Sequence, residues 1–227
     1  MCGIAGLFQP NASELQAALR ATRLMTNAIT HRGPDSEGHW AEEGASLVLG
    51  HRRLAILDLS PAGHQPMHSV CGRYVIAFNG EIYNHRELRH ALRGAGSEDP
   101  RWQGHSDTET LLAAFTAWGV EATLKRCEGM FAIALWDRRA RQLTLARDRF
   151  GEKPLHMTST STGFAYASEV TELSILTGTL LKPNYDHVKK FLVNGYNALY
   201  KAHETFFAGV TEVAAGTVIH IDDDGTI

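Results

Sequence analysis

Apolar runs of strand length alternate along this chain with segments of helical periodicity, which predicts a mixed α+β protein. The run Gly3–Phe8 is rich in small apolar residues and predicts a buried strand. After it, one side of a helix is outlined by residues at helical spacing, namely Leu15, Leu19, Thr22, Met25 and Ile29. We therefore expect a helix that lies with one face on a sheet.

Two runs near the middle of the chain give the clearest strand predictions. Arg73–Phe78 is rich in β-branched and aromatic residues. Phe131–Trp136 is apolar at every position, which is typical of a strand covered on both faces. Gln142–Ala146 follows a short charged turn and is expected to pair back on it as a hairpin.

Two capped helices are predicted between these strands. Asn84, with Glu87 three residues later, has the pattern of a helix start. Ser106 and Glu109 repeat that pattern for a second helix, which Gly119 is expected to end.

The Asn79-Gly80 pair lies between the first of these strands and the first of these helices. Asn-Gly between apolar runs is the strongest short hairpin signal. The helical signal that follows instead places the pair on a strand-to-helix turn, where backbone N–H groups can bind an anion.

The last part of the chain, after Gly178, changes character. Val188–Val193 predicts a short helix or strand, and Thr217–Ile221 predicts a strand. The turn Asp222–Gly225 is followed by only two residues, so we expect the sequence to be a piece of a longer protein.

Composition narrows the range of functions. The net charge is -3 and the isoelectric point is near 6.4, which gives no electrostatic case for nucleic acid or for an anionic membrane surface. No apolar stretch approaches the length of a membrane span, and no signal peptide is seen. The 12 histidines show neither an HExxH motif nor a paired Cys/His spacing, so no metal site is expected.

The three cysteines, Cys2, Cys71 and Cys127, form an odd and sparse set without a CxxC spacing. Such a set fits a reducing compartment better than a disulfide framework, and we expect a cytoplasmic protein. Cys71 and Cys127 carry no further signal.

Cys2 is the candidate for chemistry. Its small side chain favours removal of Met1, which would leave a free α-amine beside the thiol. An unperturbed α-amine has a pKa of about 7.7–8.0 and a cysteine thiol one of about 8.5. The thiolate is then a nucleophile and the amine its base, as in N-terminal nucleophile enzymes. Alone, a cysteine at position 2 is more often a small residue without chemistry.

Eight stretches decide between these interpretations. In chain order they are MCGIAGLF, HRGPD, GHRRLAILDLS, FNGEIYNH, SDTE, GMFAIALWD, ARDRFGEKPL and ASE. In this order they resemble the glutaminase half of asparagine synthetases, which are class II glutamine amidotransferases. Pro34-Asp35 and the GEIYNH stretch are more similar to that branch than to the sugar-phosphate or purine branches.

The resemblance implies the fold of the N-terminal nucleophile (Ntn) hydrolases, in the α+β class. That fold is a four-layer αββα sandwich of two antiparallel sheets between helices. The glutaminase domain is expected over residues 1–180, with residues 181–227 as a linker region toward a synthetase domain.

The resemblance also assigns the catalytic groups. Cys2 would attack the side-chain amide of glutamine, and its α-amine would carry the proton. The side chain of Asn79 and the N–H of Gly80 would form the oxyanion hole.

The remaining roles concern recognition of free glutamine, which is a zwitterion. Arg53 would bind the α-carboxylate, and a guanidinium fork suits that planar acceptor. Glu81 and Asp107 would accept the α-ammonium. Backbone groups around Leu54 and Ile56 would line the same pocket. Taken alone, Asp107 is more often a helix cap than a binding residue.

The expected partners and cofactors depend on which nucleotide-binding motifs the sequence contains. Neither an SGG-x-DS pyrophosphate loop nor a GxxxxGK motif occurs in residues 1–227. No cofactor is expected in this chain, and ATP and Mg²⁺ are expected only in a synthetase domain of the same polypeptide. L-glutamine is the expected substrate, and a homodimer is left open.

The leading hypothesis is hydrolysis of L-glutamine through a γ-glutamyl thioester on Cys2, with ammonia supplied to ATP-dependent amidation of aspartate or another carboxylate. One alternative is a non-catalytic regulatory domain that keeps the fold. Another is a stand-alone hydrolase of other γ-glutamyl amides.

Overall fold

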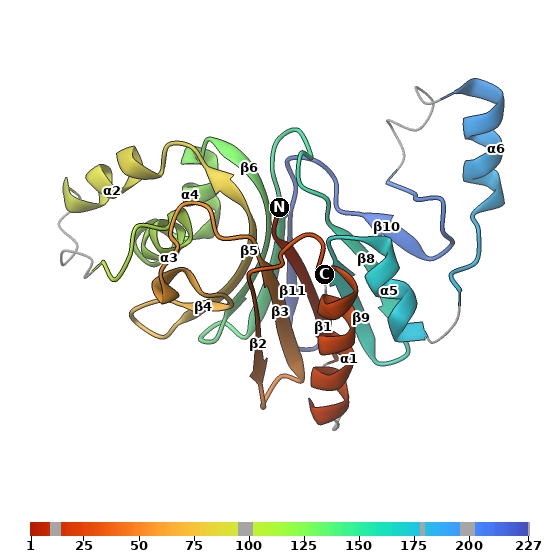
Figure 1. The fold of residues 1–227 in the computed structure, drawn as a ribbon, viewed down its shortest axis with the longest axis horizontal. Helices are drawn as coiled ribbons and strands as arrows, with labels where there is room; N and C mark the ends of the chain where they lie inside the picture. Colours follow the sequence, from red (N-terminus) through yellow and green to blue (C-terminus); the bar gives the residue numbers. More distant parts are fainter. Residues whose placement is uncertain (10–14, 95–101, 178–179, 196–202, 227) are drawn as a thin grey trace.

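Two antiparallel sheets lie face to face at the centre of the molecule, with helices on both outer faces (Figure 1). This computed structural model describes residues 1–9, 15–94, 102–177, 180–195 and 203–226. The arrangement is a four-layer αββα sandwich, so the expected α+β class and Ntn-hydrolase architecture are confirmed.

The first sheet, sheet A, carries the N-terminal strand near its centre. Its strands, in spatial order, are β10 (Val210–Glu212), β8 (His156–Thr160), β9 (Gly163–Ala167), β1 (Gly3–Phe8), β3 (Leu47–Arg53) and β2 (Ser36–Glu42). Strand β1 pairs with β3 on one side and with β9 on the other. The strand that directly follows Cys2 is therefore held by neighbours on both edges.

The second sheet, sheet B, contains the strongly apolar strand of the sequence. Its strands, in spatial order, are β11 (Val218–Asp222), β7 (Gln142–Arg147), β6 (Gly129–Asp137), β5 (Tyr74–Ile82) and β4 (Met67–His68). Along β6, Ala132, Ala134 and Trp136 face the core between the sheets. The alternate residues of Phe131–Leu135 pack on the helical layer. The prediction that this strand is covered on both faces is confirmed.

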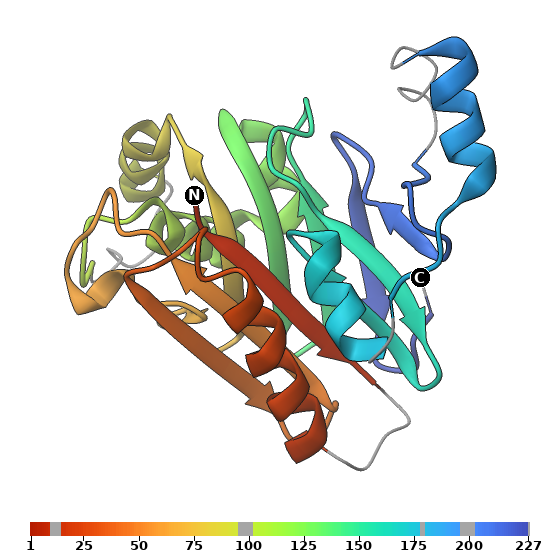
Figure 2. The same ribbon diagram turned by 45° about the vertical axis from the view of Figure 1, so that its right-hand side comes forward.

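The helices form two outer layers. Sheet A is covered by α1 (Leu15–Ala28) and α5 (Val170–Thr177), which lie side by side on its outer face (Figure 2). Sheet B is covered by α2 (His85–Gly94), α3 (Asp107–Trp118) and α4 (Val120–Arg126). A short 3₁₀ turn, η1, spans Pro61–Gly63, and α6 (Tyr185–Asn194) projects away from the body of the molecule (Figure 1).

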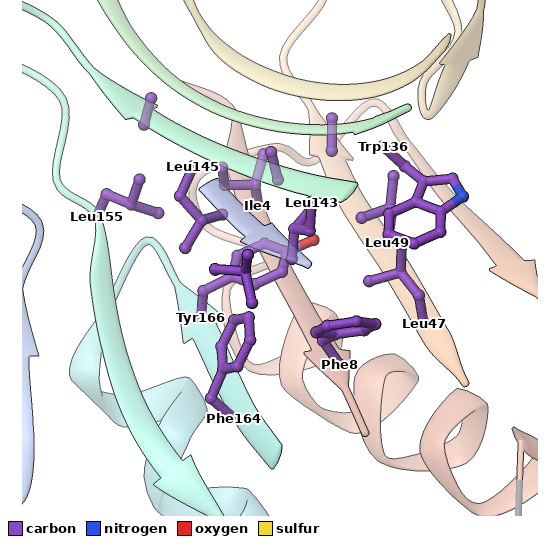
Figure 3. Close-up of a cluster of buried hydrophobic side chains, with 14 of the residues drawn as sticks. Ile4, Phe8, Leu47, Leu49, Trp136, Leu143, Leu145, Leu155, Phe164 and Tyr166 are labelled. Atoms are coloured by element: carbon purple, nitrogen blue, oxygen red, sulfur yellow. The ribbon is translucent and has the colours of Figure 1, made fainter. Parts of the chain in front are cut away.

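Large side chains fill the space between the two sheets (Figure 3). The rings of Phe8 and Trp136 lie 5.9 Å apart and join β1 to β6 across the sandwich. Burial of such apolar surface is the main favourable term in folding. The core therefore fixes the two sheets against each other behind the end of β1.

The structure corrects the position predicted for Asn79-Gly80. The pair does not form a strand-to-helix turn but lies inside β5, opposite Ala132 and Phe131 of β6. A side chain at position 80 would overlap the backbone of β6, so the glycine serves close strand contact instead of a turn.

The predicted cap of α2 is also different. The Asn84 side chain does not bond to its own helix. Its amide accepts from Glu128 N and donates to the Arg126 carbonyl, which ties the start of α2 to the loop before β6. In α3, by contrast, the Ser106 hydroxyl accepts from Glu109 N as expected. Helix α4, which directly follows Gly119, was not predicted.

The range expected to be a linker contributes to both sheets. Strand β10 pairs with β8 in sheet A, and β11 pairs with β7 in sheet B. These segments are integrated in the sandwich, so the expected boundary at residue 180 does not separate them from it. That residues 181–227 lead toward a further domain stays a prediction.

Replacement of Leu49 by Ala tests the core. Leu49 is 0% exposed between the sheets, and its truncation should lower the free energy of unfolding by about 2–5 kcal/mol because a cavity replaces buried apolar contacts. Urea unfolding followed by circular dichroism measures this change. Leu24→Ala is the matched control, because Leu24 is 58% exposed on α1. Equal losses for the two variants would contradict the assigned core.

Candidate active site

Cys2 lies directly before β1, where the ends of β1 and β3 meet. In the β1–β3 register Gly3 is opposite Arg52, so the chain that leaves β3 passes beside Cys2. The N–H of Leu54 donates to Cys2 Sγ at 3.4 Å. A backbone donor therefore holds the thiol at the edge of sheet A where β1 begins. This position agrees with the strand predicted for Gly3–Phe8, which directly follows Cys2.

A pocket of about 120 Å³ opens beside this thiol. It is lined by all eight residues proposed from the sequence, namely Cys2, Arg53, Leu54, Ile56, Asn79, Gly80, Glu81 and Asp107. These residues come from the position before β1, the end of β3 and the loop after it, β5 and the start of α3. The structure thus brings together every predicted site residue.

Asn79 supplies an unused donor to this pocket. It is 1% exposed, and its Nδ2 has no hydrogen-bond partner among the described residues. Its side chain shares a face of β5 with Val75 and Ala77, which face sheet A and therefore the side of Cys2. A buried amide without a partner is costly unless a ligand provides the acceptor.

The N–H of Gly80 points to the open edge of β5. Its partner Phe131 uses both backbone groups on Asp148, accepting at 2.9 Å and donating at 3.1 Å. Gly80 and Phe131 are therefore a non-hydrogen-bonded pair, in which both N–H groups point away from each other.

Two side chains occupy the neighbouring N–H groups on that edge. Gln65 Oε1 accepts from Phe78 N at 2.7 Å, and Asp107 Oδ2 accepts from Ile82 N at 2.9 Å. The N–H of Gly80 lies between them. Together with Asn79 Nδ2 it provides two adjacent donors that face the pocket.

The charge state of Cys2 depends on opposing effects. Burial raises the pKa of the thiol. The Leu54 N–H, the terminal ammonium and Arg53 lower that pKa, and Asp107 raises it. A reactive thiolate at neutral pH therefore requires additional positive charge or a nearby base.

Arg53 is anchored by the loop that follows β3. Its guanidinium donates to the carbonyls of Asp58 and Ser60. Gly63 leaves room for it, because a side chain there would overlap the guanidinium. Ile56, which also lines the pocket, is 68% exposed on this loop.

Asp58 holds the same loop in place. Its carboxylate accepts from Ser60 N at 2.8 Å, from the Ser60 hydroxyl at 2.6 Å and from His105 N at 2.8 Å. The bond from the Ser60 hydroxyl, followed by the His105 N–H, lowers the pKa of Asp58 to about 2. The loop with Arg53 is thereby tied to the chain that enters α3.

Asp107 is both a helix-start residue and a pocket residue. Burial raises its pKa to about 6, although backbone N–H groups of Ile82 and Thr108 lower it and Glu81 raises it further. Its carboxylate is poised to change charge close to neutrality.

A second group of residues anchors the N-terminal strand. Arg32 Nε donates to the Cys2 carbonyl at 3.0 Å, and its Nη1 pairs with Glu169 at 3.0 Å. The Ser168 hydroxyl accepts from Ile4 N at 2.9 Å. These residues lie in the HRGPD and ASE stretches, which carried the resemblance but received no role from sequence reasoning.

Gln65 and Lys153 are further pocket residues that the sequence did not single out. Lys153 lies in the GEKPL stretch, which was the available signal for it. Gln65 carries no motif, and only the three-dimensional contact with the edge of β5 identifies it.

Neither a metal-binding cluster nor a membrane-spanning helix occurs in the described parts of the chain. Within these residues there is no group of three or more His, Cys, Asp or Glu side chains that could hold a metal ion. Among the helices described, none is long and apolar enough to cross a membrane.

Comparison with known proteins shows the family of this chain. The family model described as a glutamine amidotransferase domain matches residues 1–227. The chain belongs to the glutamine amidotransferase family. It is an enzyme domain of class II, and the resemblance to asparagine synthetases is confirmed by its relatives.

Two such relatives illustrate the match. This glutamine amidotransferase domain is 35% identical over 230 residues to the glutamine-hydrolyzing asparagine synthetase 1 of Bacillus subtilis. The match covers 100% of this chain and 34% of that protein. It is 40% identical over 177 residues to asparagine synthetase B of Escherichia coli, covering 76% of the chain and 30% of that protein. The chain spans about a third of the length of these curated relatives.

A solved structure supports the fold. Glutamine phosphoribosylpyrophosphate amidotransferase from Bacillus subtilis superposes with a TM-score of 0.71 at 20% identity, over 99% of this chain and 48% of that one. At this identity the match shows the architecture alone.

Asp58→Asn tests the anchoring of the site loop. Because the pKa of Asp58 is lowered in the folded state, its ionised form stabilises that state above the unfolded pKa, near 4, and the contribution is lost as pH falls toward 2. The variant should be less stable than the wild type at pH 7, and the gap should narrow at pH 3. Urea unfolding at both pH values measures it. Asp186→Asn on α6 is the control, and a gap that is independent of pH would contradict the assignment.

Proposed function

We propose that this domain hydrolyses L-glutamine to glutamate and ammonia through a γ-glutamyl thioester on Cys2. The observation that carries the proposal is the pair of unused donors on β5 beside the thiol, Asn79 Nδ2 and Gly80 N–H. Donors fixed before the reaction stabilise the charge that develops on a carbonyl oxygen during acyl transfer.

In the first half-reaction, the Cys2 thiolate adds to the side-chain amide carbon of glutamine. The carbonyl oxygen becomes an oxyanion that accepts from Asn79 Nδ2 and Gly80 N–H. The α-amine of Cys2, freed by removal of Met1, takes the thiol proton and passes it to the departing nitrogen. The C–N bond breaks, ammonia leaves, and the glutamyl group stays on sulfur.

In the second half-reaction, water adds to the thioester carbon while the same α-amine accepts a proton from it. The oxyanion forms again between the two donors. The C–S bond then breaks, the thiol is regenerated, and glutamate leaves.

Recognition of glutamine follows from the charges around the pocket. The Arg53 guanidinium, held by the loop carbonyls, suits the planar α-carboxylate. Glu81 and Asp107 line the same pocket and suit the α-ammonium. Together these groups favour the zwitterion over an amide in a peptide chain.

We further propose that the ammonia serves ATP-dependent amidation in a synthetase domain of the same polypeptide, with aspartate or another carboxylate as acceptor. The support is that relatives named as glutamine-hydrolyzing asparagine synthetases are about three times as long as this chain. ATP and Mg²⁺ would bind in that domain.

Cys2→Ala provides the direct test of the nucleophile. The trimmed wild-type chain should acquire one adduct of the glutamine analogue 6-diazo-5-oxo-norleucine on Cys2, and excess glutamine should block it. The variant should acquire none and should lose glutaminase activity. Intact and peptide mass spectrometry measure the adduct.

Cys71→Ala is the matched control for this experiment, because Cys71 is an exposed free cysteine. It should label and turn over glutamine like the wild type. Absence of an adduct on a trimmed wild-type chain would contradict the glutaminase proposal. Equal or better turnover of γ-glutamyl alkylamides would favour the stand-alone hydrolase instead.

The charge of Asp107 predicts a pH dependence of glutamine binding. With a pKa of about 6, its carboxylate becomes neutral as pH falls through that value and loses its attraction for the α-ammonium. In the Cys2→Ala background, the Kd for glutamine should rise by roughly tenfold for each pH unit below 6, because one proton competes with binding. Isothermal titration calorimetry between pH 7.5 and pH 5 measures it.

Asp107→Asn in the same background is the comparison. It should weaken binding at pH 7.5 by roughly tenfold or more, since the acceptor of the α-ammonium loses its negative charge, and it should remove the dependence near pH 6. A parent chain that binds equally well at pH 7.5 and pH 5 would refute the role of Asp107.

A further inference from the structure

Lys153 is buried beside the N-terminus although it is a charged residue. It follows β7 in the loop that leads to β8 and is 5% exposed. Its side chain lines the pocket that contains Cys2 and Asn79. Burial of an ammonium group is energetically unfavourable unless hydrogen-bond acceptors surround it. The buried position of Lys153 therefore suggests a role for its charge.

The backbone around Lys153 is fixed by its neighbours. Arg147 Nε donates to the Lys153 carbonyl at 2.8 Å, and Lys153 N donates to Asp148 Oδ2 at 3.0 Å. Asp148 also accepts from Phe150 N and Glu152 N, so the whole loop is wound around one carboxylate. The lysine side chain therefore extends into the site from a rigid base.

The ammonium group has a weak acceptor. Lys153 Nζ donates to the sulfur of Met1 at 3.2 Å. A thioether is a poor acceptor for an ammonium group. Within the described ranges, Lys153 Nζ forms no ion pair with a carboxylate.

Removal of Met1, which the proposed function requires, changes this environment. It takes away the thioether and creates the free α-amine of Cys2 at the adjoining position. The Lys153 ammonium then shares the lining of one pocket with the Cys2 thiol.

We propose that Lys153 is a positioning residue for the mature N-terminus, whose positive charge favours the neutral α-amine and the thiolate of Cys2. The proposal rests on the proposed function, because it needs the trimmed chain. An amine that acts as a base must be unprotonated, and a neighbouring cation disfavours its charged form. The same cation favours the charged form of the thiol.

The other basic groups around Cys2 have partners or are neutral, although Arg53 also lowers the pKa of the Cys2 thiol. Arg32 donates to the Cys2 carbonyl but is paired with Glu169. Arg53 is held by loop carbonyls and is assigned to the substrate carboxylate. His51 is neutral, since burial lowers its pKa to about 3.

The acidic groups act in the opposite direction. Asp107 raises the pKa of the Cys2 thiol, and burial raises it further. Glu81 lines the same pocket and adds negative charge on that side. Among the described residues that line this pocket, Lys153 is thus a cation that remains available to offset these effects after glutamine has engaged Arg53.

The test compares Lys153→Met, which removes the charge, with Lys153→Arg, which keeps it. Trimmed chains are treated with iodoacetamide across a range of pH, and peptide mass spectrometry follows the rate at Cys2. The midpoint for Lys153→Met should rise by about one pH unit, as expected for loss of a nearby charge. Lys153→Arg should keep the wild-type midpoint. Lys125→Met is the control, because the Lys125 side chain is 79% exposed on α4.

An unchanged midpoint in folded Lys153→Met, or equal shifts in the Met and Arg variants, would overturn the proposal. If Lys153→Met does not fold, the Cys2 α-amine of the trimmed wild type is titrated by ¹⁵N NMR. It should titrate below the value in the urea-unfolded chain, and an equal or higher value overturns the proposal. Failure of the diazo-ketone to label the wild type would instead refute the glutaminase function, since iodoacetamide needs no glutamine pocket.

Discussion

The pairing of β1 with both β3 and β9 is the constraint on which the site depends. Opposite Tyr166, position 6 tolerates only glycine, since any side chain there would overlap the tyrosine hydroxyl and the Val48 carbonyl. This close packing brings the start of β1 against the chain leaving β3, where the Leu54 N–H meets the Cys2 sulfur. Cys2, the proposed nucleophile, is therefore positioned by the register of the sheet.

The contact between the two sheets provides the second half of the site. His51 of β3 donates its Nε2–H to the Phe78 carbonyl of β5 at 3.1 Å, next to Asn79. Because β4 is short, the far end of β5 keeps an open edge, and Gln65 and Asp107 occupy the N–H groups on either side of Gly80. Sheet A thus begins directly after Cys2, the proposed nucleophile, and sheet B carries Asn79 and Gly80, the proposed oxyanion donors, while the core behind them fixes the spacing.

Sequence patterns predicted much of this arrangement where local and tertiary preferences agree. The alternating burial of β6 and the cap at Ser106 are such cases. The position of Asn79-Gly80 was predicted wrongly, because its turn signal is a local property of the sequence. The pairing with β6, which extends β5 through these residues, is a tertiary contact that the local signal does not contain. The pocket residues themselves were found through the family resemblance. Lys153 and Gln65 required the structure, since only tertiary contacts bring them to the pocket.

The central claim is that Asn79 and Gly80 hold the developing oxyanion of a Cys2-bound glutamyl group. A crystal structure of the trimmed chain after reaction with 6-diazo-5-oxo-norleucine tests it most directly. The account predicts a thioether bond to Cys2 and the ketone oxygen within about 2.7–3.1 Å of both Asn79 Nδ2 and Gly80 N. A ketone oxygen directed away from both donors, or an adduct on Cys71 alone, would contradict it.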